Sequence, residues 1–190
     1  MAATPSKMPA LGTQASEFHL PDTVSGKTIS LATFTGKEAL LIMFLSRHCP
    51  FVQHIKDELA RLGQDYGRRG VGMVAISAND AVNYPDDAPE RLKEMAEQAG
   101  FNFPFCYEEN QETARAYQAA CTPDFFLFDR EGRLAYRGQL DDSRPGNQIP
   151  VSGRDLRAAL DALLAGKPVA AEQKPSIGCN IKWKPGKESS

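Results

Sequence analysis

ALLIMFLSRHCP, residues 39–50, is the stretch of sequence that decides the fold. Its first part, 39–45, is a continuous apolar run of strand length, which is typical of a strand buried on both faces of a sheet. Apolar residues then recur at helical spacing over 51–66, and Pro50 suits the first position of a helix. Cys49 is therefore predicted to lie where a buried strand turns into a long helix.

Further elements extend from this unit in both directions. On its N-terminal side, two short alternating segments at 17–20 and 28–31 predict a β-hairpin. On its C-terminal side the pattern predicts a strand, a helix, a short strand, a short helix, a hairpin and an amphipathic helix, at 71–77, 89–99, 103–107, 111–118, 124–138 and 152–166. This order is the plan of a mixed sheet covered by helices on both faces, so the predicted class is α/β.

The two ends of the chain lack this periodicity. The sequence divides into a flexible arm, a single domain and a C-terminal tail, at 1–16, 17–166 and 167–190. The tail carries Ile177, Ile181 and the sole tryptophan, Trp183, among its lysines. Because a tail left in solvent has little reason to carry these side chains, we expect residues 174–184 to dock on the domain.

Composition narrows the range of partners. A formal net charge of −2 gives no electrostatic reason to expect nucleic acid or an anionic membrane as a partner. The N-terminal segment lacks an apolar signal-peptide region, and no later stretch is long and apolar enough to span a membrane. The sequence therefore predicts a soluble, cytoplasmic protein.

Four cysteines, at positions 49, 106, 121 and 179, form no C-x-x-C pair. In a reducing compartment such thiols are structural, catalytic or metal-binding. No two of them have zinc-finger spacing, so neither a resident metal nor another cofactor is predicted. Cys106 lies between two aromatic residues of a predicted strand and is expected in the core.

Three aspartates follow the second buried strand, at positions 80, 86 and 87. They lack the spacing and the glycine of an EF-hand calcium loop. We expect them to form a solvated loop.

Three motifs carry a resemblance to a known family: HCPFV at 48–52, CTPDFFLFD at 121–129 and PSIGCNIKW at 175–183. Together with the element order, they resemble the peroxiredoxin-like proteins of alkyl hydroperoxide reductase/thiol-specific antioxidant type, in the thioredoxin superfamily. The resemblance implies a thioredoxin-like fold with an N-terminal hairpin extension and a C-terminal tail. It also implies a cis peptide bond before Pro123, beside the active-site sulfur.

The sequence departs from the better-known branches of that superfamily. Val52 stands where thioredoxins carry the second cysteine of C-x-x-C, so exchange within that motif is excluded. Ile42 and Ser46 replace the proline and threonine that precede the peroxidatic cysteine of peroxiredoxins, and Pro123 falls where their arginine would lie. Efficient peroxidase activity is therefore not expected.

Cys49 is the candidate nucleophile, because the unpaired N–H groups and the dipole at a helix N-terminus favour a thiolate. His48 and Pro50 flank it and are expected to contact the substrate. Resemblance to thioredoxin-like proteins implies that Pro123 shapes the binding edge and that Thr122 offers its backbone to an incoming peptide strand.

A second thiol is needed to resolve the intermediate formed on the nucleophile, and Cys121, Cys179 or an external thiol could supply it. The leading hypothesis is a thiol-dependent oxidoreductase of exchange or antioxidant type. Its substrate would be a protein or small-molecule disulfide or peroxide, and an external thiol would reduce it. Two alternatives remain: a non-catalytic binding or redox-sensor module, and a metal chaperone that uses Cys49 with His48.

Overall fold

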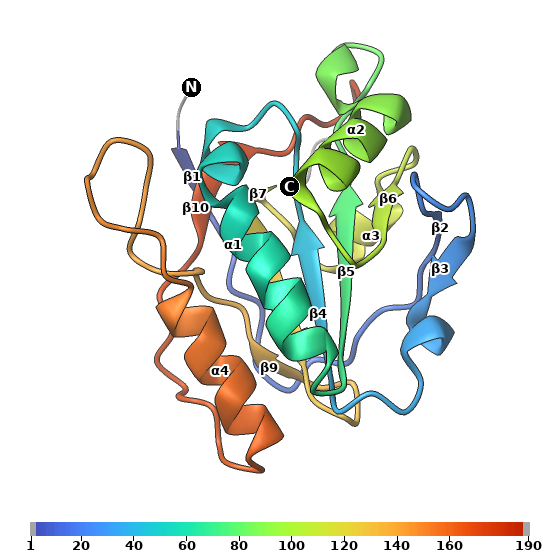
Figure 1. The fold of residues 1–190 in the computed structure, drawn as a ribbon. Helices are drawn as coiled ribbons and strands as arrows, with labels where there is room; N and C mark the ends of the chain where they lie inside the picture. The colour runs from blue at the N-terminus through green and yellow to red at the C-terminus, as the bar shows by residue number, and fades with distance from the viewer. Residues whose placement is uncertain (1–2, 188–190) are drawn as a thin grey trace.

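A five-stranded mixed sheet forms the centre of the molecule in the computed structural model, which describes residues 3–187 (Figure 1). Its strand order is β6-β5-β4-β8-β9, with bounds Phe105–Tyr107, Val71–Ser77, Ala39–Phe44, Asp124–Phe128 and Leu134–Tyr136. β4, β5 and β6 are parallel, whereas β8 and β9 are antiparallel to their neighbours. Every residue of β4 and β5 is buried, as the continuous apolar runs predicted.

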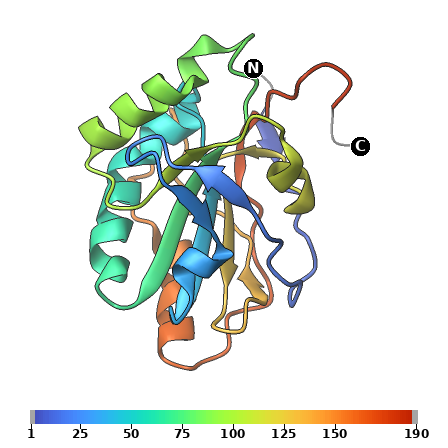
Figure 2. The same ribbon diagram turned by 90° about the vertical axis from the view of Figure 1, so that its right-hand side faces the viewer.

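Alternate side chains of β4 divide the core into two layers. On one face, Leu41 and Met43 pack with the helices α1, α2 and α4, which span Pro50–Gly67, Pro89–Ala99 and Arg154–Leu164. On the other face, Ile42 and Phe44 pack with the hairpin β2-β3 and with α3, which span His19–Pro21, Thr28–Ser30 and Glu112–Ala116 (Figure 2). Helices therefore cover both faces of the sheet, as the element order predicted. Two short 3-10 helices, η1 at Leu31–Phe34 and η2 at Pro85–Asp87, complete the connections.

A second sheet joins the two ends of the chain. Its order is β1-β10-β7, with bounds Ala3–Pro5, Ile177–Asn180 and Cys121–Thr122, and both pairings are antiparallel. Residues 3–5 thus pair with the tail, where the sequence suggested a flexible arm. Gly12 and Ala15 also donate backbone hydrogen bonds, to the carbonyls of Leu134 and Gly132. β1 has only three residues and its partner β10 is distant in the sequence, so hydrophobic periodicity could not predict this strand.

The segment after α4 returns over the domain to the upper end of the sheet (Figure 1). Ile181 is 1% exposed and belongs to the second core layer, and Trp183 is half-buried against the same layer. The Lys182 carbonyl accepts hydrogen bonds from the Asp80 backbone and the Gln111 side chain, at 2.8 and 3.0 Å. The tail is consequently held by backbone pairing, by burial and by polar contacts.

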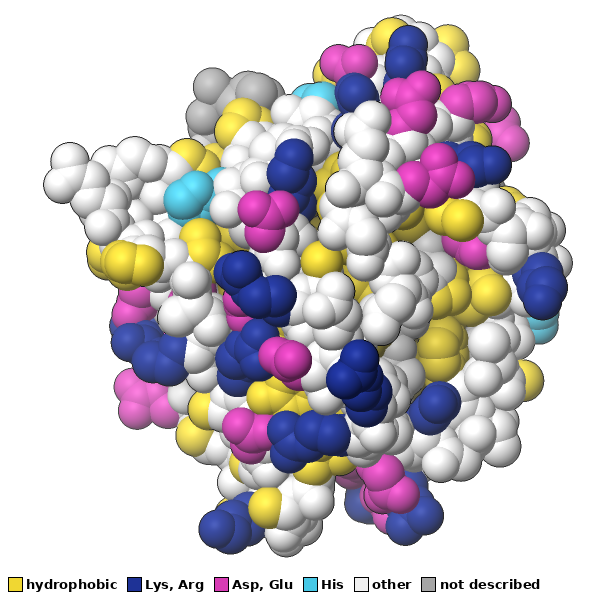
Figure 3. Space-filling model, in the orientation of Figure 1, with side chains coloured by type: hydrophobic (Ala, Val, Ile, Leu, Met, Phe, Trp, Pro, Cys, Tyr) yellow, Lys and Arg dark blue, Asp and Glu magenta, His cyan; other side chains and the backbone are white. Residues whose placement is uncertain are grey.

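The helical face of the molecule carries charges of both signs. Lysine, arginine and acidic side chains alternate over α1 and α4 (Figure 3). Arg157 links Glu58 and Asp65 of α1, at 2.7 and 2.8 Å, and joins the two helices in this way. Among the described residues, no helix is long and apolar enough to cross a membrane.

Candidate active site

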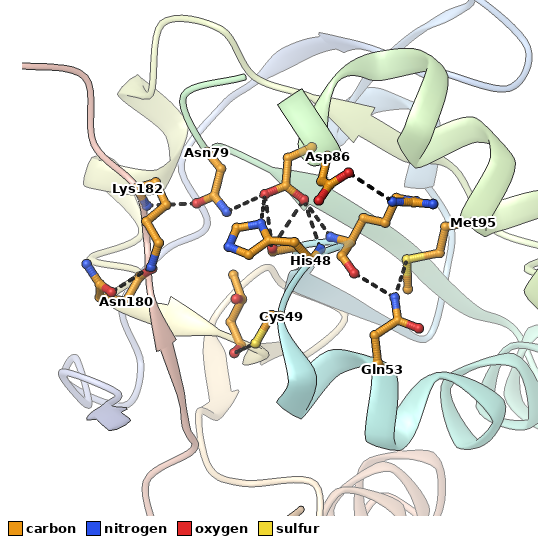
Figure 4. Close-up of polar contacts among 12 residues, drawn as sticks. His48, Cys49, Gln53, Asn79, Asp86, Met95, Asn180 and Lys182 are labelled. Carbon is orange, nitrogen blue, oxygen red and sulfur yellow. Dashed lines mark hydrogen bonds and ion pairs between the residues drawn. The ribbon is translucent and has the colours of Figure 1, made fainter. Parts of the chain in front are cut away.

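Cys49 occupies the position predicted from the sequence, between a buried strand and a long helix. It is the N-cap residue of α1, Pro50 is the first helical residue, and the Cys49 side chain is fully buried. The Cys49 thiol donates a hydrogen bond to the carbonyl oxygen of Thr122, with 3.1 Å between sulfur and oxygen (Figure 4). The helix N-terminus and the Thr122 carbonyl therefore meet at one sulfur atom.

The segment facing Cys49 is the turn between β7 and β8. The peptide bond between Thr122 and Pro123 is cis, which confirms the prediction. Cys121 is fully buried, and its thiol donates to the carbonyl oxygen of Pro123 at 3.5 Å. Burial raises the pKa of the Cys121 thiol, and the neighbouring Asp124 raises it further.

Cys179 of β10 lies beside this turn. In the antiparallel pairing Cys179 is opposite Thr122, the residue whose carbonyl accepts from Cys49. Burial raises the pKa of Cys179 to about 12, and a hydrogen bond and charge repulsion from Cys49 add to the shift. Cys49, Cys121 and Cys179 are therefore gathered into one cluster, and all are free thiols.

Cys106 stands apart from this cluster. It belongs to the core layer on the hairpin side of the sheet, whereas Cys49 and Cys179 belong to the layer on the helical side. Burial raises the pKa of Cys106 to about 12, with a smaller contribution from the charge of Asp22. Its surroundings are those of a core cysteine.

The loop before Cys49 is held by the buried carboxylate of Asp87. The two carboxylate oxygens accept hydrogen bonds from the Ser46 hydroxyl at 3.0 and 3.1 Å and from the Arg47 backbone at 2.6 Å. His48 Nδ1 lies 2.6 Å from the carboxylate, and the Asn79 side chain donates to it at 2.7 Å. Since an ionised carboxylate only accepts, Nδ1 of His48 carries the hydrogen of that bond.

Asp87 was expected in a solvated loop, and that interpretation is wrong. Asp87 is 0% exposed and Asp80 is 3% exposed, whereas the Asp86 side chain remains 68% exposed. Although burial raises the pKa of Asp87, hydrogen bonds from His48 and Asn79 outweigh it, so the pKa lies below its ordinary value. Ser46 and Asp87 are separated by 41 positions, so the local sequence pattern could not reveal this contact.

Polar and aromatic contacts connect this loop to the tail. Asn79, which donates to Asp87, also accepts a hydrogen bond from the backbone N–H of Lys182 at 2.8 Å. The ring of Tyr84 stacks on His48 with 5.8 Å between centroids, and Lys182 Nζ lies 5.8 Å from the same ring. Figure 4 shows His48 and Cys49 between the tail residues Asn180 and Lys182 and the helical residue Gln53.

Cys49 and His48, the ligands of the metal-chaperone alternative, are engaged by Thr122 and Asp87. His54 lies on α1, and its Nε2 atom is 2.7 Å from the Ser143 hydroxyl. Within residues 3–187 no group of three or more His, Cys, Asp or Glu side chains is arranged to hold a metal ion. The site in the described residues is thus a cluster of thiols beside a histidine–carboxylate pair.

Comparison with known sequences gives a family and a distant relative. The sequence model of the AhpC/TSA family matches residues 11–137. The thiol-disulfide oxidoreductase ResA of Bacillus thuringiensis (strain Al Hakam) is 25% identical over 124 residues, which cover 65% of this chain and 66% of ResA. The match therefore spans just under two thirds of that relative's length.

Two solved structures resemble the chain over almost its full length. An uncharacterized conserved protein from Geobacillus kaustophilus is 55% identical, with a TM-score of 0.96 and coverage of 98% of both chains. A hypothetical protein from Sinorhizobium meliloti 1021 is 50% identical, with a TM-score of 0.94 and coverage of 96% of this chain and 100% of the other. Both share the whole architecture, including the region of the tail.

Proposed function

The chain belongs to the AhpC/TSA family of the thioredoxin superfamily, and from this premise we propose that it is a thiol-disulfide oxidoreductase with Cys49 as nucleophile and Cys179 as resolving thiol. One observation carries the proposal. Cys179 lies opposite Thr122 in the β-pairing, and the Thr122 carbonyl accepts the hydrogen bond of the Cys49 thiol. The proposed resolving cysteine therefore lies opposite the residue that contacts the attacking sulfur.

The reaction has two exchange steps. The Cys49 thiolate attacks one sulfur of a substrate disulfide, forms a mixed disulfide and releases the first substrate thiolate, which takes up a proton. The Cys179 sulfur then attacks the Cys49 sulfur and breaks its bond to the substrate sulfur, and the second substrate thiolate leaves and takes up the proton that Cys179 loses. The protein loses two electrons and gains a Cys49–Cys179 disulfide, while the substrate disulfide is reduced to two thiols. Two equivalents of an external thiol restore the dithiol form and are oxidised to a disulfide.

The surrounding residues have separate parts in this scheme. Cys49 lies at the N-terminus of α1, where the helix dipole favours negative charge, and Pro50 allows the helix to begin directly after it. The Asp87 carboxylate fixes the backbone at Arg47 and the ring of His48, and so holds the loop that carries the nucleophile. Thr122 and Pro123 align the resolving strand with the nucleophile.

Cys121 is less suited to resolve the intermediate. The thiols of Cys121 and Cys179 are both buried, but the Cys121 thiol donates to the Pro123 carbonyl, and a negative charge at Asp124 further disfavours its thiolate. Peroxide is also a poor substrate in this scheme, because the Ser46 hydroxyl that replaces the peroxiredoxin threonine is engaged with Asp87. The cytoplasm is the proposed compartment, since it keeps unpaired cysteines reduced.

Mass spectrometry of the oxidised protein tests the proposal. Reduced protein is treated with one equivalent of bis(2-hydroxyethyl) disulfide, and we expect a 49–179 crosslink in the peptide map. Cys49→Ser should form no crosslink, and Cys179→Ser should accumulate a mixed disulfide on Cys49. Cys106→Ala is the matched control, a buried cysteine outside the cluster, and should behave as the wild type. Full turnover by Cys179→Ser without a mixed disulfide would contradict the role of Cys179.

A further inference from the structure

The backbone edge expected to receive a peptide is already occupied. Resemblance to thioredoxin-like proteins suggested that Thr122 offers its backbone to an incoming strand, but Thr122 pairs with Cys179 of the chain itself. The pairing continues at Cys121, which is opposite Asn180, and the Ile181 N–H donates to the Ala120 carbonyl at 3.2 Å. The C-terminal segment thus lies where a substrate strand would bind and presents a cysteine to Cys49.

Strand β10 is the central strand of its sheet and is paired on both sides. Its second edge is paired with β1, and the Ser6 N–H donates to the Ser176 carbonyl at 2.8 Å. The Ser176 hydroxyl donates to the Pro123 carbonyl at 2.6 Å. At Gly178 a Cβ atom would collide with the carbonyl group of Thr122, so the two backbones are in direct contact.

On the side of β7 that β10 occupies, the pairing keeps an added strand away from the nucleophile. With both edges of β10 paired, a further strand on this side of β7 could join only at the outer edge of β1, three strand spacings from β7. At about 4.8 Å per spacing, that strand would lie roughly 14 Å from Thr122. A disulfide needs Cα atoms about 4.4–6.8 Å apart, so a cysteine in such a strand could not reach Cys49.

A small disulfide does not have to displace β10 to reach Cys49. Pro50, next to Cys49, and Asn180, next to Cys179, are exposed, and His48 is half-buried, so both thiols lie one residue away from a surface position. Rotation of exposed side chains occurs in picoseconds to nanoseconds, whereas removal of a paired strand requires local unfolding. A small disulfide that needs only side-chain rotation should therefore reach Cys49 far more often than a peptide strand that needs β10 to detach.

We propose, on the basis of the proposed function, that the substrate is a low-molecular-weight disulfide and not a cysteine in a protein or peptide strand, because β10 fills the strand-binding edge beside Cys49. In this arrangement Cys179 takes the place that the cysteine of a bound peptide would have. The two-step exchange then runs between a small disulfide and an internal dithiol.

Rates of crosslinking with two oxidants test this substrate class. Reduced full-length protein is mixed with bis(2-hydroxyethyl) disulfide or with insulin, and formation of the 49–179 crosslink is followed by quenched mass spectrometry. Each rate is divided by the rate at which the same oxidant reacts with dithiothreitol. We expect the normalised rate with insulin to be about 100-fold lower, as for a path that needs a conformer populated at about 1%.

Equal normalised rates would overturn the substrate class and leave the proposed function intact, because the crosslink would still form through Cys49. If neither oxidant gave a 49–179 crosslink, the proposed function and this inference would both fail.

Loosening of β10 provides a second test. Gly178→Ala places a methyl group against the Thr122 carbonyl, whereas Gly67→Ala at the end of α1 adds a methyl group at an ordinary contact of 3.8 Å and serves as the control. We expect Gly178→Ala to speed alkylation of Cys179 by iodoacetamide and to raise the insulin rate relative to the small-disulfide rate by about tenfold. Faster alkylation of Cys179 with an unchanged ratio of the two rates would overturn the inference.

Discussion

Asp87 and Asp124 are buried carboxyl groups that belong to the two halves of the site. Asp87 lies under the nucleophile half, the loop 46–49, and its oxygens accept hydrogen bonds from Ser46, Arg47 and Asn79 and contact His48. Asp124 lies in the partner half, directly after Pro123 at the start of β8. Its Oδ2 accepts from the Ala120 backbone at 3.1 Å, but its Oδ1 has no hydrogen-bond partner in the described structure.

Both side chains are 0% exposed, so burial alone does not set their charge. At Asp87 the donors outweigh burial, and the pKa lies below its ordinary value. At Asp124 burial outweighs the donors, and the pKa rises to about 7. The number and direction of donors thus keep one half of the site negatively charged and allow the other to stay neutral.

The raised pKa of Asp124 lowers the negative charge beside the thiols at pH 7 and below. A negative charge at Asp124 raises the pKa of Cys121 and disfavours an anionic sulfur nearby. The negative charge of Asp87, in contrast, is neutralised by a ring of donors in the loop that holds Cys49 in place. Variants that remove one charge at a time should separate these two environments.

The largest expected effect is the pH dependence of stability contributed by Asp124. Its pKa is about 7 in the folded state, above the ordinary value of 3.8, so the folded protein binds more protons than the unfolded chain between these values. The contribution of Asp124 is therefore full below about pH 4 and is lost as pH rises through 7, by up to about 4 kcal/mol. Asp124→Asn should remove this loss, which urea unfolding at pH 5 and pH 8 would measure.

Asp57→Asn is the matched control for that experiment, because Asp57 is an exposed aspartate on α1. It should leave the difference in unfolding free energy between pH 5 and pH 8 as in the wild type. If Asp124→Asn kept the wild-type pH dependence as well, Asp124 would be ionised in the folded state and the contrast with Asp87 would fail.

The next effect is the stability contributed by the Asp87 network. Asp87→Asn retains the shape of the side chain but removes the charge that accepts from Ser46 and from the Arg47 backbone. We expect a loss of about 3 kcal/mol in the free energy of unfolding, as for hydrogen bonds to a buried charged group. Asp86→Asn, one residue earlier and 68% exposed, should change it by less than about 0.5 kcal/mol.

Reactivity gives a readout of Asp87 that stability alone does not. Because Asp87 holds the backbone before Cys49, Asp87→Asn should slow crosslinking of folded protein with bis(2-hydroxyethyl) disulfide, measured well below the unfolding transition. Wild-type rates in such a sample would mean that Asp87 supports the fold but does not position the nucleophile.

How much of this site the sequence predicted depends on how local each contact is. The junction of β4, Cys49 and α1 is encoded by neighbouring residues, so an apolar run and a helical period were sufficient to predict it. Asp87 illustrates the opposite case. Three aspartates in a loop have the composition of a solvated segment, and only the approach of Ser46 and His48 from a distant position buries one of them.

The small sheet at the ends of the chain was missed for the same reason. β1 has three residues and β7 has two, which is too short for alternation to be recognised. Their partner β10 lies more than fifty positions from β7 along the sequence, within the lysine-rich C-terminal tail. Composition indicated that the tail carries anchors, but the register that places Cys179 opposite Thr122 follows only from the folded chain.

The acid side of the pH profile sharpens the comparison of the two aspartates. The folded pKa of Asp87 lies below its unfolded value, so its stabilising contribution is present above about pH 4 and is lost as pH falls through the folded pKa. The free energy of unfolding of Asp87→Asn should therefore fall less than that of the wild type between pH 4 and pH 2.5. Urea unfolding at a series of pH values would measure this difference. If the unfolding free energy of Asp87→Asn fell as steeply below pH 4 as that of the wild type, other carboxylates would dominate the acid dependence.

The smallest expected effect concerns Tyr84, which links the Asp87 half of the site to the tail. Its ring stacks on His48 and lies near Lys182 Nζ, but it is 39% exposed, so solvent weakens both contacts. Tyr84→Leu should lower the free energy of unfolding by about 1 kcal/mol, the usual size of an aromatic or cation–π contact. Val82→Ala in the same loop is the control, since Val82 is 84% exposed and its truncation should have little effect.

If the ring also fixes His48 over the nucleophile, Tyr84→Leu should slow crosslinking with the small disulfide, whereas Val82→Ala should not. Equal rates for the two variants would limit the positioning of His48 to Asp87, whose hydrogen bond to Nδ1 is the shorter and more buried contact.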